Sequence, residues 1–263
     1  MRNLRHHLRS ALGALLILAQ GPAAPAAPPR SLAIAAAADL QFALAEMKAA
    51  FTKADPGLEV SVTYGASGTF YTQLINKAPF DLFLSADSGF PQKLVEAGVA
   101  DGATSFQYSR GHLVLWVPAA SPIPLEQLGM KALLHPAARK VAIANPRHAP
   151  YGRAAEAALA RLGLLEAVKP RLVFGENIAQ TAQFVQTGAA DIGLIALSLA
   201  KAPAMAGGRM WEVPQDAHPP LDQGGVILNH AKNRAGALAF RSFMQSPEGR
   251  AILRKYGFDT GSR

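Results

Sequence analysis

Short apolar segments alternate with helical segments along almost the whole chain, and this alternation restricts its fold more than any other feature. The apolar segments predicted to be strands cover residues 31–35, 58–64, 80–85, 112–117, 140–144, 171–174, 191–196, 210–213 and 225–229. Most of them are separated by segments whose apolar residues recur at helical spacing. Strands that alternate with helices of this kind form parallel βαβ units with helices on both sheet faces. The sequence therefore predicts an α/β fold.

The first 26 residues are typical of a secretory signal peptide. Arg2, Arg5 and Arg9 form a basic start without any acidic residue, residues 11–19 are apolar, and residues 24–26 offer a small-residue cleavage site. The apolar run is too short to span a bilayer as a permanent helix. No cysteine follows it, which argues against a lipid anchor. We therefore expect a periplasmic protein.

Composition and charge exclude several classes of function. The 263 residues include no cysteine, which excludes disulfide scaffolds, thiolate metal sites and cysteine nucleophiles. Removal of the three arginines of the signal peptide lowers the formal net charge from +8 to +5. The remaining basic residues form no run interleaved with aromatic residues, so nucleic acid is not an expected partner. The histidines lack the spacing of metal ligands, and neither a metal cation nor a cofactor is expected.

Four predicted strand-to-helix turns have compositions that suit an anion. They cover residues 35–40, 64–70, 145–152 and 175–180. Ligands of open α/β sheets bind at the carboxyl ends of strands, where helix N-termini point. The free N–H groups of a first helical turn and the positive end of the helix dipole bind anions without any formal charge. Four such turns in one chain predict a site for a small oxyanion.

The sequence resembles the periplasmic molybdate-binding proteins of ABC importers, which have the type II periplasmic binding protein fold. The resemblance spans residues 33–258 and rests on residues 35–40, 65–68, 78–87, 149–152, 175–180 and 256–258. It implies a two-lobed α/β fold, in which each lobe is a mostly parallel sheet flanked by helices. After a signal peptide of residues 1–26, lobe one is predicted to hold residues 27–111 and 216–263, and lobe two residues 112–215.

The resemblance also implies which residues hold the oxyanion. In this family the anion contacts the first turn, here Ala38 and Asp39, and the serine of the second turn, here Ser67. The other lobe supplies backbone at the third and fourth turns, here Tyr151 and Ile178, and the tyrosine hydroxyl is expected to contribute. The implied function is capture of molybdate or tungstate in the interlobe cleft and delivery to an ABC membrane permease. A monomer without enzymatic activity is expected.

Asp39 is the departure from this pattern, because a carboxylate repels an oxyanion. Two unit charges about 4 Å apart cost roughly 4 kcal/mol at an effective dielectric near 20. The favoured interpretation is that Asp39 caps a helix and that its side chain bonds the amides of Gln41 or Phe42. In the alternative, the carboxylate accepts a proton from a protonated anion, which would favour hydrogen phosphate over molybdate.

Two other classes of function stay open at this point. The same fold binds other anions, so phosphate, sulfate or an organic anion is an alternative ligand. An enzyme that uses Ser67 as its nucleophile is a further alternative. Residues 65–69 lack the glycine spacing of a nucleophile elbow, which disfavours a hydrolase.

Overall fold

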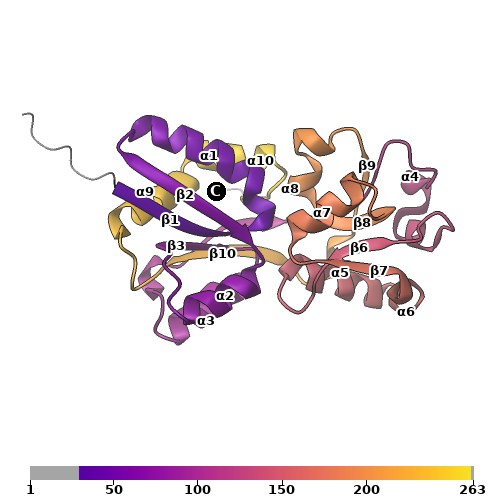
Figure 1. Cartoon of the computed structure of the whole chain (residues 1–263), viewed down its shortest axis with the longest axis horizontal. Helices are drawn as coiled ribbons and strands as arrows, with labels where there is room; N and C mark the ends of the chain where they lie inside the picture. Colours follow the sequence, from indigo (N-terminus) through magenta and orange to yellow (C-terminus); the bar gives the residue numbers. More distant parts are fainter. Residues whose placement is uncertain (1–29, 262–263) are drawn as a thin grey trace, which may run out of the picture.

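Two five-stranded sheets form the framework of the computed structural model, which describes residues 30–261 (Figure 1). The strand order is β2-β1-β3-β10-β4 in the first sheet and β7-β6-β8-β5-β9 in the second. Helices flank both sheets, and the two units lie side by side along the long axis of the molecule. The predicted two-lobed α/β fold is confirmed. We call the unit around the first sheet lobe one and the other unit lobe two.

Lobe one combines elements from both ends of the chain. Its strands are β1 (Arg30–Ala37), β2 (Leu58–Gly65), β3 (Leu82–Ser85), β4 (Phe106–Gly111) and β10 (Leu221–Ile227). Its helices are α1 (Gln41–Ala54), α2 (Ser67–Ile75), α3 (Gly89–Glu96), α9 (Arg234–Gln245) and α10 (Pro247–Lys255). Helices α1, α9 and α10 cover one face of the sheet, and α2 and α3 cover the other (Figure 1).

Lobe two is continuous in sequence. Its strands are β5 (Leu113–Val117), β6 (Val141–Ala144), β7 (Leu172–Gly175), β8 (Ile192–Ala196) and β9 (Arg209–Glu212). Its helices are α4 (Leu125–Leu128), α5 (Pro150–Arg161), α6 (Leu165–Val168), α7 (Ile178–Gln186) and α8 (Leu197–Ala200). Short 3₁₀ turns lie at Ala38–Leu40, Gly102–Thr104, Gly129–Leu134, Lys169–Arg171, Pro203–Met205 and Gln215–Ala217.

Both sheets are mixed rather than mostly parallel. In lobe one, β1 runs parallel to β2 and β3, whereas β10 runs antiparallel to β3 and β4. In lobe two, β6 runs parallel to β7 and β8, whereas β5 runs antiparallel to β8 and β9. Strand β4 was not among the predicted strands, because Gln107 and Arg110 interrupt its apolar pattern. It pairs with β10 at the sheet edge, where polar side chains reach solvent.

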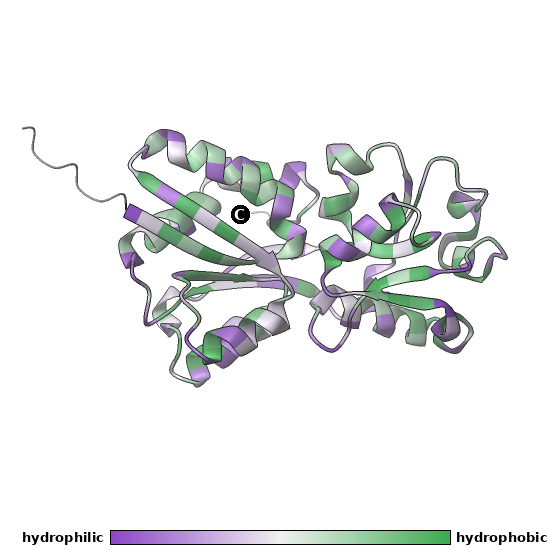
Figure 2. Ribbon diagram, in the orientation of Figure 1, coloured by the Kyte–Doolittle hydropathy of each residue, from purple (hydrophilic) through white to green (hydrophobic). Residues whose placement is uncertain are grey.

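The cores lie between the sheets and their helices. Every residue of β3, β5, β6 and β8 is buried, as expected for strands covered on both faces. Figure 2 shows that hydrophobic residues colour these strands and that hydrophilic residues lie mainly on the outward helix faces and loops. No helix within residues 30–261 combines the length and apolar character needed to cross a membrane.

The chain passes between the lobes at two places. His112 alone separates β4 from β5, and residues 213–220 join β9 to β10. Two closely spaced connections of this kind suit a hinge. The residue limits given above for the two lobes stay a prediction, and the predicted signal peptide lies outside the described residues.

Candidate anion-binding site

A small cavity of about 10 Å³ lies between the lobes, where the turns that follow several strands come together. It is lined by Ala37, Ala38, Asp39, Gly65, Ala66, Ser67, Ala86, Ala149, Pro150, Tyr151 and Ile178. The structure thus brings together all five residues predicted from the sequence to contact an oxyanion. Their role in binding stays a prediction at this point.

Three helices begin at this cavity and present free backbone donors. Ser67 is the first residue of α2, Tyr151 the second of α5 and Ile178 the first of α7. Among the described residues, none of their three N–H groups has a hydrogen-bond partner. Asn177 fixes the start of α7, because its side-chain Oδ1 accepts hydrogen bonds from the backbone N–H groups of Ala179 and Gln180. The result is a cluster of donors and positive helix ends without any formal charge.

The Ser67 hydroxyl adds a side-chain donor to this cluster. Ser67 is fully buried, and its Oγ accepts a hydrogen bond of 3.0 Å from the backbone N–H of Ala86. The hydroxyl does not cap α2, whose N-cap residue is Ala66. A hydroxyl that already accepts one bond still has its own proton to donate. Ser67 is therefore able to donate to a ligand in the cavity.

The interpretation of Asp39 as a helix cap is wrong. Residues Ala38–Leu40 form a 3₁₀ turn ahead of α1, which turns the Asp39 side chain inward, and neither Gln41 nor Phe42 donates to it. Instead, Asp39 Oδ2 accepts from Tyr151 Oη at 3.1 Å and from Gln223 Nε2 at 2.5 Å. The other oxygen, Oδ1, is buried and accepts no hydrogen bond, although the nearby backbone amides of Asp39 and Leu40 lower the pKa of this carboxyl. Asp39 is 1% exposed.

Burial shifts the acid–base equilibrium of Asp39. Desolvation raises the pKa of this carboxyl from 3.8 to about 6, although the hydrogen bonds from Gln223 and Tyr151 oppose the shift. Burial and the nearby carboxylate also raise the pKa of Tyr151 well above its ordinary value, so that Tyr151 keeps its proton. The carboxyl of Asp39 therefore changes charge close to neutral pH.

The Tyr151 hydroxyl contacts Asp39. We expected this hydroxyl to contribute to the anion site, but its proton is donated to Asp39. Tyr151 is therefore best placed to contact a ligand through its backbone N–H. Gln223 completes this network, since its side-chain amide also donates to Tyr151 Oη at 3.3 Å. The sequence offered no signal for Gln223, which lies 184 residues after Asp39 and meets it only through the position of β10.

Contacts between the lobes surround the cavity. The N–H of Gly68 in lobe one donates to the carbonyl of His148 in lobe two at 2.9 Å. Ser198 Oγ in lobe two donates to the Asp39 carbonyl at 2.8 Å. The lobes are thus closed over the residues that line the cavity.

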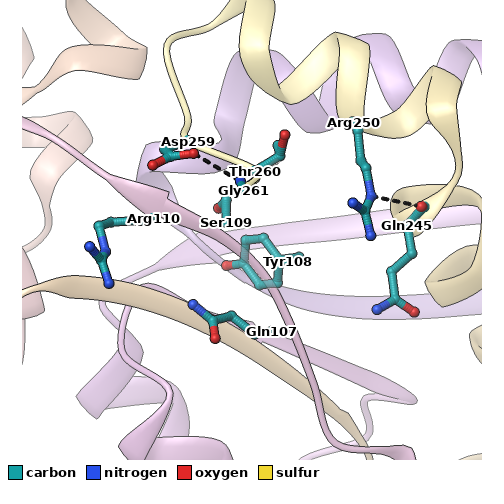
Figure 3. Close-up of a pocket in the computed structure, with 9 residues that line it drawn as sticks. All are labelled: Gln107, Tyr108, Ser109, Arg110, Gln245, Arg250, Asp259, Thr260 and Gly261. Atoms are coloured by element: carbon teal, nitrogen blue, oxygen red, sulfur yellow. Dashed lines mark hydrogen bonds between the residues drawn. The ribbon is translucent and has the colours of Figure 1, made fainter. Parts of the chain in front are cut away.

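A second hollow lies between β4 and the C-terminal segment (Figure 3). It is lined by Gln107, Tyr108, Ser109, Arg110, Gln245, Arg250, Asp259, Thr260 and Gly261. Its charged groups already have partners: Arg110 pairs with Asp222 at 2.7 Å, and Arg250 donates to the Gln245 carbonyl at 3.0 Å. None of its lining residues belongs to the first turn of an α-helix. The interlobe cavity is therefore the better candidate for an anion site.

Two lobes that close over a cavity lined by helix N-termini define a two-lobed solute-binding protein. Residues 32–259 match the family described as bacterial extracellular solute-binding protein. The chain belongs to this family.

Relatives and solved structures agree with this membership. The chain is 41% identical to the molybdate-binding protein ModA of Rhodobacter capsulatus over 245 residues, which cover 93% of this chain and 94% of the relative. The solved periplasmic molybdate-binding protein of Azotobacter vinelandii has a TM-score of 0.82 and 33% identity and covers 88% of this chain and 100% of its own. A sulfate-binding protein of Mycobacterium tuberculosis, at 17% identity and a TM-score of 0.71, shares the fold; the match covers 87% of this chain and 86% of that one. The predicted resemblance to molybdate-binding proteins is confirmed.

Proposed function

We propose that the protein captures molybdate in the interlobe cavity and delivers it to the membrane permease of an ABC importer. The observation that carries this proposal is the meeting of unpartnered amides at Ser67, Tyr151 and Ile178 in one cavity. The names of the two molybdate-binding relatives support the choice of anion. Tungstate, with the same charge and tetrahedral shape, is the second expected ligand. In this proposal the protein is a periplasmic monomer that needs no cofactor and catalyses no reaction.

Closure of the lobes completes the proposed site. Lobe one supplies Ala38, Asp39 and Ser67, whereas lobe two supplies the amides of Tyr151 and Ile178. An anion bound to lobe one therefore lacks half of its donors until lobe two closes over it. Charge-assisted hydrogen bonds stabilise a bound anion by about 1.5–3 kcal/mol each. Selection among tetrahedral anions then follows from cavity size, because molybdate is larger than sulfate.

Isothermal titration calorimetry of the purified protein with molybdate, tungstate, sulfate and phosphate tests the proposal. We expect molybdate and tungstate to bind with a stoichiometry of one and at least 100-fold more tightly than sulfate or phosphate. If neither metal oxyanion binds, the proposed ligand is wrong, whatever the result for the other two anions.

Substitution of Ser67 by alanine is expected to weaken molybdate binding by 10- to 100-fold. The variant loses a charge-assisted hydrogen bond to the anion and also leaves the Ala86 N–H without its acceptor. The matched control is Thr69→Ala, which removes an exposed hydroxyl two residues further along α2. Equal affinities of Ser67→Ala and the wild-type protein in the same titration would remove Ser67 from the site.

Phosphate is the alternative to molybdate and tungstate, and the buried carboxyl of Asp39 is the feature that favours it. The unpartnered Oδ1 of an ionised Asp39 could accept the proton of hydrogen phosphate, whereas molybdate brings no proton. Tight phosphate binding in the titration above would support this alternative. A serine-based enzyme has less support, because Ser67 Oγ bonds a backbone amide and, among the described residues, no histidine or carboxylate.

A further inference from the structure

The unpartnered oxygen of Asp39 distinguishes this residue from the rest of the cavity lining. Among the described residues that line the cavity, Asp39 alone has a buried side-chain polar atom without a hydrogen-bond partner. A buried polar atom without a partner is costly, and for an ionised carboxylate the cost is higher still. Asp39 lines a cavity whose backbone N–H groups are donors, and a ligand bound in this cavity could supply the missing hydrogen-bond partner of Oδ1.

Within residues 30–261, no positively charged side chain faces Asp39 to offset an ionised carboxylate. The groups around it are Tyr151 on α5, Gln223 on β10, Tyr108 on β4, Ser198 on α8 and the backbone amides of Asp39 and Leu40. The two tyrosines are the titratable groups among them, and burial raises the pKa of both well above the ordinary value, so both stay neutral. In the described part of the chain, no lysine, arginine or histidine shifts the pKa of Asp39. A proton is therefore the simplest way to neutralise this carboxyl.

We propose that Asp39 holds the bound anion as a neutral carboxylic acid, so that capture of one molybdate dianion takes up one proton. This inference rests on the proposed function. The proton adds to Oδ1, and the new O–H donates a hydrogen bond to one anion oxygen. Oδ2 stays the acceptor of Tyr151 and Gln223. No other bond forms or breaks, and repulsion between an ionised Asp39 and the anion is replaced by one more donor.

Because molybdate binding takes up a proton, the affinity for molybdate depends on pH. Burial raises the pKa of Asp39 to about 6 in the closed protein without ligand, and the charge of a bound dianion raises it further. Between these two pKa values, the complex carries a proton that the free protein lacks. Affinity therefore falls as the pH rises, by about tenfold per pH unit within this window. Asparagine at position 39 has a permanent N–H donor and needs no proton.

Calorimetric titration with molybdate from pH 6.5 to 8.5 tests the inference. Each pH is measured in two oxyanion-free buffers of different ionisation enthalpy, since the difference in heat counts the protons taken up. For the wild-type protein we expect uptake close to one proton and a Kd that rises at least 30-fold across this range. For Asp39→Asn we expect no uptake, a Kd that changes less than twofold, and tighter binding than wild type at pH 8.5. Asp216→Asn, at an exposed carboxylate, is the matched control and should behave as wild type.

The outcomes separate this inference from the proposed function. Molybdate binding without proton uptake and without pH dependence overturns the role of Asp39 and leaves the ligand assignment intact. No molybdate binding at any pH, in wild type and in Asp39→Asn, means that the ligand assignment itself has failed. Phosphate that binds wild type tightly at pH 8.5 but not Asp39→Asn overturns the inference as well, because Asp39 then acts as an ionised acceptor. The proton count on wild type stands even if the variant does not fold.

Discussion

Substitution of Gly68 by alanine is expected to weaken molybdate binding by at least tenfold and to leave both lobes folded. Gly68 lies in the first turn of α2, where its N–H bonds the His148 carbonyl of the opposite lobe. A Cβ at this position would lie 2.7 Å from that carbonyl oxygen and 3.0 Å from the His148 Cα. Both are backbone atoms that no side-chain rotation can move. The lobes would have to stay apart, and the donors of lobe two would miss the anion.

The measurement compares Kd by titration calorimetry with the free energy of unfolding by urea denaturation. The change in Kd should be large, whereas the unfolding free energy should change little, because the clash exists only between closed lobes. Gly207→Ala is the matched control, since a Cβ there has no atom within 4 Å. Wild-type affinity of Gly68→Ala would show that the closed contact between α2 and His148 is not needed for binding.

Substitution of Gly152 by alanine is expected to destabilise lobe two by roughly 3 kcal/mol or more, at the upper end of overpacking effects. Gly152 follows Tyr151 at the start of α5, and a Cβ there would lie 2.2 Å from the Ala144 carbonyl oxygen at the end of β6. Helix α5 has to move away from the sheet to relieve this overlap. Because the amide of Tyr151 moves with the helix, the anion site is damaged together with the fold.

Urea denaturation monitored by tryptophan fluorescence tests this expectation, because Trp116 and Trp211 both belong to lobe two. Gly207→Ala again serves as the control. A stability within about 0.5 kcal/mol of wild type, the range usual for harmless surface changes, would mean that α5 and β6 can separate without cost. The close packing of Gly152 would then have no bearing on how the Tyr151 amide is held.

The sequence predicted the parts of the proposed site that depend on local pattern. Ser67, Tyr151 and Ile178 each follow a strand at the start of a helix, and small residues and turn formers next to them are visible in the sequence. Free amides at a helix start are a property of every helix, so their presence did not depend on tertiary structure. The alternation of strands and helices predicted the α/β class, and four such turns predicted an oxyanion site. The two-lobed fold and the position of the site between the lobes came from the resemblance to molybdate-binding proteins.

The parts that sequence reasoning missed depend on contacts between distant segments. Asp39 precedes a helix and has the residue type of a cap, but the 3₁₀ turn and the donors from Tyr151 and Gln223 direct its side chain inward. The mixed direction of the sheets likewise depends on β4, β5, β9 and β10, next to the two chain crossings. Nothing in the pattern of a single segment reveals which strand lies beside it.

The position of β10 in the sheet has a consequence for the order in which the two lobes fold. Lobe two uses strands between residues 113 and 212 only, whereas the sheet of lobe one needs β10 between β3 and β4. A chain that emerges from its N-terminus can thus assemble lobe two while the earlier strands of lobe one still await their last partner. Gln223 arrives on that same strand, so Asp39 acquires this donor only after the strands of lobe two have been synthesised. The fold therefore delays completion of the proposed binding site until β10 has joined the sheet of lobe one.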